Sequence, residues 1–163
     1  MPVRAPMTPE ALKAVDGWTI PVSESSYAGL ASRVTALAID AAILTITALT
    51  ISILPVVAWR EVIGTSPGWL KALCGILAAV LPWLYFTFSW HWSGQTAGNL
   101  LIGIAVQRDS GGRVSIVQAG LRAAIGLAFA PVWLAGLLGI LWSKRRRAWH
   151  DVVFRTTVRR VVR

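Results

Sequence analysis

The chain is poor in charged residues, and acidic residues are especially scarce. Only 14% of its 163 residues are Asp, Glu, Lys or Arg, whereas about 25% is usual for a soluble domain. The 7 acidic residues face 16 Lys and Arg, and 55% of the residues are hydrophobic. This balance excludes an ordinary soluble domain and indicates a single integral membrane domain.

Cysteine and histidine are almost absent. Cys74 is the only cysteine, so the chain has neither an internal disulfide nor a thiol pair for a metal. The two histidines, His91 and His150, belong to no His-x-x-x-His motif, and the chain lacks Gly-x-Ser-x-Gly and phosphate-binding loops. We therefore expect no enzymatic activity, no metal and no cofactor, and a structural role for His150 beside Asp151.

No apolar run typical of a cleavable leader is visible near residue 1, so we expect none. Residues 1–27 contain Pro2, Pro6, Pro9 and Pro21 among polar and charged residues. This composition predicts a flexible, soluble N-terminal tail. The first apolar run must then itself act as the insertion signal.

Two long apolar runs follow, over residues 30–57 and 68–90, with a loop expected at 60–67. Between Val34 and Trp59 the one charged residue is Asp40. Both runs are long enough to cross a bilayer as helices. Pro82 should kink the second helix, and Trp90 and Trp92 near its end resemble an interfacial aromatic belt.

The stretch after the second span predicts a small cytoplasmic β-hairpin. Residues 93–99 are small and polar, typical of a loop or the start of a short interfacial helix. Residues 102–107 and 113–117 are rich in β-branched residues and flank a turn at 109–112, so they should pair as antiparallel strands over 102–117. Residues 156–162 are also β-prone and could add a third strand.

The third apolar segment, residues 119–142, allows two topologies. Its length favours a single crossing, which would place six cations on one side and ten on the other. A segment that bends at Pro131 and re-enters would place fourteen cations on one side and two on the other, in better agreement with the usual cytoplasmic bias. We favour the re-entrant form, with both tails cytoplasmic and a basic tail over 143–163.

The predicted fold class is therefore an all-α integral membrane protein. It has two long transmembrane helices, a third spanning or Pro-bent re-entrant segment, and the small cytoplasmic β-hairpin.

The charged residues of the first span are the strongest functional signal. A carboxylate inside a span costs about 2.5–3.5 kcal/mol on insertion scales, so Asp40 should have a use, either in transport or as hydrogen-bonding glue between helices. Arg33, seven residues earlier, lies on the same helix face. We expect Arg33 to pair with Asp151 at the cytoplasmic interface, the alternative being contact with lipid phosphate. Arg122 is the candidate cation beside Asp40.

Together these features resemble the RDD family of membrane proteins, which is named for one Arg and two Asp. Arg33, Asp40 and Asp151 match those three residues. The loop Gly94-Gln95-Thr96-Ala97-Gly98 and the strand 103–106 match the family in order and spacing. The resemblance covers residues 27–162, so we define the membrane domain as 28–162. Asn99 departs from the family, which usually has Lys at this position.

The resemblance implies a bacterial cytoplasmic membrane and suspected transport, with cation–proton exchange suggested for some members. We expect a transporter that exchanges a small solute or ion for protons, with Asp40 as the titrating group. The alternative is an accessory or assembly subunit of a larger membrane complex. The coupling residues would be Arg33, Asp40 and Asp151, and the supporting residues Arg122, Gly94, Gln95, Thr96, Gly98 and His150.

The expected partners follow from size and charge. Two or three spans cannot easily enclose a pathway, so we expect a homo-oligomer or partner membrane subunits. The basic tail should contact anionic lipid headgroups at the bilayer surface. Because the cations flank apolar spans, we expect no nucleic acid.

Overall fold

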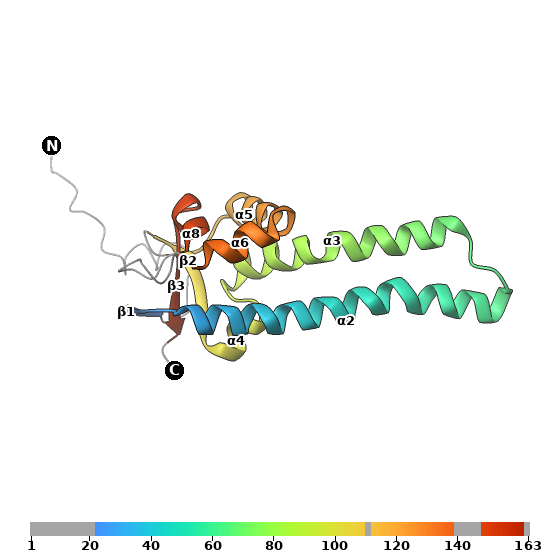
Figure 1. The fold of residues 1–163 in the computed structure, drawn as a ribbon, viewed down its shortest axis with the longest axis horizontal. Helices are drawn as coiled ribbons and strands as arrows, with labels where there is room; N and C mark the ends of the chain where they lie inside the picture. The colour runs from blue at the N-terminus through green and yellow to red at the C-terminus, as the bar shows by residue number, and fades with distance from the viewer. Residues whose placement is uncertain (1–21, 110–111, 139–147, 162–163) are drawn as a thin grey trace.

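The computed structural model describes residues 22–109, 112–138 and 148–161. Helices α2 (Leu30–Ile63) and α3 (Gly68–Trp92) run side by side, and the sheet and the short helices gather at one end of this pair (Figure 1). Both helices are long and apolar enough to cross a membrane. The structure thus confirms the predicted, mostly helical membrane protein with two long spans.

Helix α2 is longer than the sequence predicted. Pro55 lies inside it, and the helix continues to Ile63 before it ends at Gly64, whose φ is 96°. The expected loop over 60–67 is therefore reduced to the turn Gly64–Pro67. Trp59 and Trp69 close this end of the pair with an edge-to-face contact of 5.7 Å between ring centroids.

The short polar stretch after α3 starts a helix, one of the two forms expected for it. Helix α4 (Ala97–Ile102) begins after Thr96, whose side chain accepts a hydrogen bond from the backbone N–H of Asn99. It ends at Gly103, which adopts a left-handed conformation that glycine tolerates best. The chain then enters strand β2 (Ile104–Arg108) directly.

The predicted pairing of 102–107 with 113–117 is wrong, although a small antiparallel sheet is present. Strand β2 pairs instead with β3 (Thr156–Val161), with Val106 opposite Val158, so the strand expected over 156–162 is confirmed. Helix α5 (Ile116–Ala128) begins inside the expected return strand because Ser115 caps it by accepting a hydrogen bond from Gln118 N at 3.2 Å.

A third strand comes from a segment expected to be a loose tail. Strand β1 (Val22–Tyr27) pairs antiparallel with β3, so the sheet order is β1-β3-β2. The flexible tail predicted over 1–27 is thus wrong for its last six residues, and residues 1–21 lie outside the described residues.

The third apolar segment is sharply bent. Helices α5 and α6 (Ala130–Gly136) meet at Phe129 with an angle of 102° between them. Pro131 explains the break, because it has no N–H to continue the α5 hydrogen-bond ladder. Leu137 then packs with Ala148 and with Leu30 at the start of α2, so the bent pair begins and ends near the sheet. Residues 139–142 of the predicted span lie outside the described residues.

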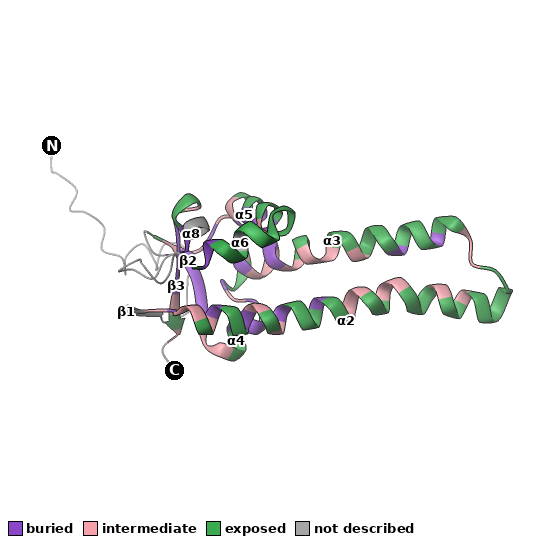
Figure 2. Ribbon diagram, in the orientation of Figure 1, coloured by how far each residue is buried: buried purple, intermediate pink, exposed green. Residues whose placement is uncertain are grey.

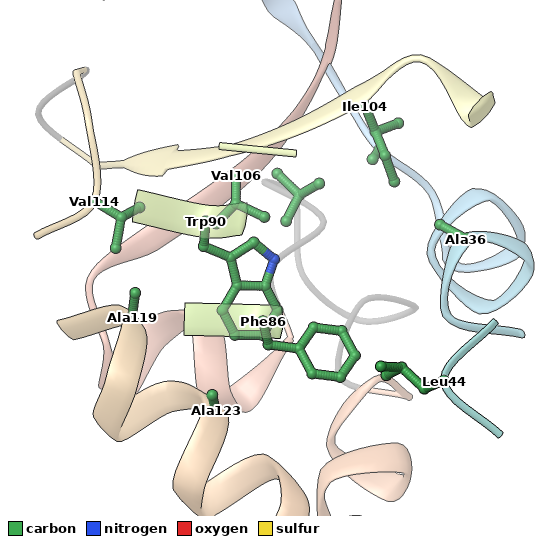
Figure 3. Packing of buried hydrophobic residues seen from close by; sticks show 11 residues of the cluster. Ala36, Leu44, Phe86, Trp90, Ile104, Val106, Val114, Ala119 and Ala123 are labelled. Atoms are coloured by element: carbon green, nitrogen blue, oxygen red, sulfur yellow. The ribbon is translucent and has the colours of Figure 1, made fainter. Parts of the chain in front are cut away.

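Buried residues concentrate where the long helices meet the sheet, while the far halves of α2 and α3 are mostly exposed (Figure 2). Trp90 lies between Val106 and Phe86, beside the face of α5 that carries Ala119 and Ala123 (Figure 3). Helix α8 (Trp149–Val153) adds to the same end and leads into β3. This core fixes the positions of the polar side chains described next.

Candidate functional site

The carboxylate of Asp40 is buried and is held by three uncharged donors. The Tyr85 hydroxyl donates to Oδ1 at 2.7 Å, and the backbone N–H of Gly98 donates to the same oxygen at 2.8 Å. The Thr96 hydroxyl donates to Oδ2 at 2.6 Å. Through this one side chain, α2 is hydrogen-bonded to α3 and to the start of α4.

Gly98 makes this arrangement possible because α4 lies against the backbone of α2. A Cβ at position 98 would overlap the carbonyl oxygen of Ala36. The neighbouring Ala97 N–H donates to the Tyr85 hydroxyl at 2.8 Å, so Tyr85 bridges the loop and Asp40. Gly98 therefore allows the backbones of α4 and α2 to lie in contact.

The loop after α3 also forms hydrogen bonds with strand β2. Gly94, with a φ of 66°, accepts a hydrogen bond from Val106 N at 2.8 Å through its carbonyl oxygen. Gln95 donates through Nε2 to the Ile104 carbonyl oxygen at 2.9 Å. Gly94 and Gln95 thus connect the Asp40 region to the sheet.

A second buried carboxylate, Asp151, lies between two arginines from different helices. Arg33 of α2 donates through Nη1 to Oδ2, and Nη2 of Arg122 in α5 lies 2.8 Å from Oδ1. The Ala148 N–H also donates to Oδ2 at 3.3 Å. Asp151 is fully buried, so its charge depends on these partners.

Arg122 is held on three sides. It contacts Asp151, donates through Nη1 to the hydroxyl of Thr156 in β3, and lies over the ring of Trp90 at 4.9 Å from the centroid. An arginine stacked on an indole gains cation–π attraction, which increases when water is excluded. Arg122 therefore connects α5, α8, β3 and α3.

A cavity of about 70 Å³ separates the two carboxylate clusters. Arg33, Asp40 and Arg122 supply its charged walls, Thr96 and Asn99 its uncharged polar walls, and Leu37, Phe86, Trp90, Ile104, Val106, Leu137 and Val158 its apolar walls. This space is large enough for a few water molecules or one small polar group. The arrangement places the guanidinium groups of Arg33 and Arg122 and the carboxylate of Asp40 around one small space.

Several predicted site residues come together here. The ion pair between Arg33 and Asp151 is confirmed, although 118 positions separate the two residues in the chain. Arg122, expected as the cation near Asp40, lines the same cavity as Asp40 but forms its ion pair with Asp151. Asp40 forms no ion pair with any described residue. His150 lies in α8, but its side chain is outside the described part of the chain.

Sequence reasoning missed three contributors. Tyr85 was detectable, since a phenol inside an apolar span needs a hydrogen-bond partner. Trp90 was expected at an interface and is instead buried against Arg122, whereas Trp92 is exposed. Thr156 gave no signal, because only the fold brings it to Arg122.

Comparison with known proteins places the chain in one family. Neither the curated proteins nor the solved structures compared with it include a match. The RDD family model matches residues 27–155, a region that contains Arg33, Asp40 and Asp151 and ends just before β3. The chain therefore belongs to the RDD family, as a membrane protein with two candidate spans, or three if the bent pair α5–α6 is a span.

Proposed function

We propose that this protein moves a small solute or ion across the membrane in exchange for protons and binds it in the cavity beside Asp40. The observation that carries the proposal is the grouping of Arg33, Asp40 and Arg122 around one cavity with largely apolar walls. Charged groups in membrane segments are costly and commonly mark ion and substrate pathways.

Asp40 offers a direct way to couple a proton to movement. All three of its hydrogen bonds are accepted by the carboxylate. A protonated carboxyl group has an O–H that must donate, so the bond at the protonated oxygen must be reversed or lost, and the remaining bonds lose their charge assistance. Thr96, which lines the cavity, and Gly98 would then be held less firmly. In this mechanism proton uptake loosens the wall formed by the 94–99 loop, and proton release restores it.

The same proposal includes a topology. We infer that α5–α6 re-enters, because the pair begins beside the sheet and Leu137 returns to Leu30 and Ala148. Both tails then share one side, which we assign to the cytoplasm of a bacterial cell from the concentration of cations there. Anionic lipid headgroups would face the basic tail.

A single chain with two or three spans cannot easily enclose a transport pathway. This supports assembly with further membrane chains. In the most apolar 18-residue window of α2, no residue is buried within the chain. In the corresponding window of α3, 17% of the residues are buried. Lipid or further protein must cover these faces. We infer a homo-oligomer or a complex with other membrane subunits, whose contact would extend the cavity into a pathway.

Reconstitution into vesicles tests the proposal. The purified protein would be placed in liposomes that enclose a pH-sensitive dye, and gradients of Na⁺, K⁺, chloride and small organic ions would be applied in turn. We expect internal pH to respond to at least one gradient, and Asp40→Asn to abolish the response. Glu61→Gln, at the exposed far end of α2, is the matched control.

The second candidate is an accessory subunit without transport of its own. The exposed faces of α2 and α3 favour it as much as they favour a homo-oligomer. Purification separates the two: a chain that is stable only with other subunits and gives no pH response supports the accessory role. Loss of membrane accumulation in Asp40→Asn would identify Asp40 as a structural anchor and remove the main support for transport.

A further inference from the structure

Three short elements at the sheet end of the helix pair carry apolar side chains that point outward. They are the second half of α4, the first turn of α5 and the end of α8. The side chains are Leu100, Leu101, Ile116, Val117, Val152 and Val153, and each is between 46% and 73% exposed. Exposed apolar surface of this kind marks an interaction site.

The tryptophans of the long helices give the height of these side chains relative to a bilayer. Trp59 and Trp69 are in contact at the far end of the pair, and Trp92, 66% exposed, ends α3 beside the sheet. Between Trp69 and Trp92 the helix rises about 35 Å, which matches a hydrocarbon core of about 30 Å with tryptophan in each interface. The same rise along α2 from Trp59 ends at Ala36, so Trp92 and Ala36 mark one edge of the core.

Contacts tie α4 and α5 to the long helices at this height. Gly98 in α4 lies against the backbone of Ala36. Nδ1 of His91, the residue before Trp92, lies 3.0 Å from the carbonyl oxygen of Val114, just before α5 begins. The second half of α4 and the first turn of α5 therefore lie at the edge of the hydrocarbon core.

Helix α8 is tied to the same height by its ion pair. Asp151 contacts Arg33, which lies about one helical turn before Ala36 in α2. The two exposed valines follow Asp151 directly, and Arg155 beyond them is also exposed. An apolar pair followed by an arginine suits the interface, where hydrocarbon can enter the acyl region and the guanidinium can reach phosphate.

We propose that these six apolar side chains form an interfacial collar, immersed in the boundary between the lipid headgroups and the acyl chains. The sheet end of the protein is then partly embedded in the membrane and does not stand clear of it. This inference goes beyond the proposed transport and does not depend on it.

Lipid fits the collar better than a protein partner because the collar is not confined to one side. Helix α4 lies beside α2, whereas α5 and α8 lie on the opposite side of the helix pair (Figure 1). One partner protein would cover one of these sides, whereas lipid surrounds a membrane protein. The collar is also continuous with a longer apolar surface, because the exposed face of α5 continues through Leu121 and Ile125.

Depth-dependent fluorescence quenching tests the collar. In a Cys74→Ala background, the full chain would carry Leu101→Cys, Val117→Cys or Val153→Cys, each labelled with bimane, in vesicles of phosphatidylcholine and phosphatidylglycerol. We expect a lipid spin label near the ester carbonyl to quench all three at least twofold more than a spin label near the chain end. The three positions report on three separate elements, and because the replaced side chains are exposed, no buried contact is lost.

Two control positions calibrate the measurement. Leu77→Cys, on the exposed face near the middle of α3, should be quenched most by the label near the chain end. Asp109→Cys, exposed just after β2, should be quenched by aqueous iodide at least fivefold more than the collar positions.

Three results would overturn the collar. Iodide quenching equal to that at position 109 would place the side chains in water. Stronger quenching by the chain-end label would place them deep in the core. Protection from iodide and from both lipid labels would show that protein covers them. Any of these results at one of the three positions removes that element and breaks the collar.

Discussion

Gly98 and Ala36 are in backbone contact, so the loop after α3 lies directly on α2. A Cβ on residue 98 would overlap the Ala36 carbonyl oxygen and come within 3.0 Å of Cγ of Asp40. Neither obstacle is the end of a flexible side chain. The position of α4, and with it the Gly98 hydrogen bond to Asp40, therefore depends on the absence of a side chain here.

Replacing Gly98 with Ala should push α4 away from α2. We expect the free energy of unfolding to fall by about 1–3 kcal/mol, the usual cost of overpacking. Denaturant titration in mixed micelles would measure it. Gly75→Ala, in an exposed part of α3 with open space around it, is the control and should be neutral or slightly stabilising. Equal behaviour of the two variants would contradict the close contact.

The buried ion pair between Arg33 and Asp151 predicts large but non-additive losses. Asp151→Asn should cost about 3–5 kcal/mol, because it removes the buried carboxylate that Arg33 and Arg122 share. Arg33→Met should cost less, because Arg122 still pairs with Asp151. The double variant should lose less than the sum of the two. The same titration would measure all three, and Arg60→Met at an exposed position is the control. Strict additivity would show that the pair contributes no coupling.

Tyr85 should be important for the loop as well as for Asp40. Tyr85→Phe removes a bond to the Asp40 carboxylate and an acceptor for Ala97 N, which should lower the free energy of unfolding by about 1–3 kcal/mol. It should also make the 94–99 backbone amides exchange faster with deuterium. Thr50→Val, whose hydroxyl bonds only to its own helix, serves as the comparison. Unchanged exchange in Tyr85→Phe would exclude the bridging role.

The re-entrant topology predicts which residues share a side of the membrane. In a Cys74→Ala background, Thr65→Cys should react with an impermeant maleimide applied from outside. Asp109→Cys and Arg160→Cys should react only after permeabilisation, because β2 and β3 pair on one side. Labelling of positions 109 and 160 from opposite sides would indicate a single crossing by α5–α6 and would also contradict the sheet.

The spans and the Arg33–Asp151 pair could be predicted, because hydrophobic length and interfacial depth are local properties of the sequence. The strand order could not, although residues 156–162 were expected to join the sheet. Residues 113–117 alternate like a strand, yet β2 selected a partner about fifty residues away that buries Val158 against the same core. Arg122 had two acids within plausible reach, Asp40 and Asp151, and only the packing of Trp90 and Thr156 decides between them. Such choices depend on long-range contacts that periodicity does not encode.

The strand order β1-β3-β2 has a consequence for biosynthesis. The middle strand is the last of the three to leave the ribosome, so the two outer strands have no common neighbour until residues 156–161 are made. Until α8 emerges, Arg33 and Arg122 also lack Asp151. Insertion of α2 and α3 therefore precedes completion of the site, and a nascent chain halted before α8 presents β1 and β2 without their shared neighbour, and both arginines without Asp151, to the cell's quality control.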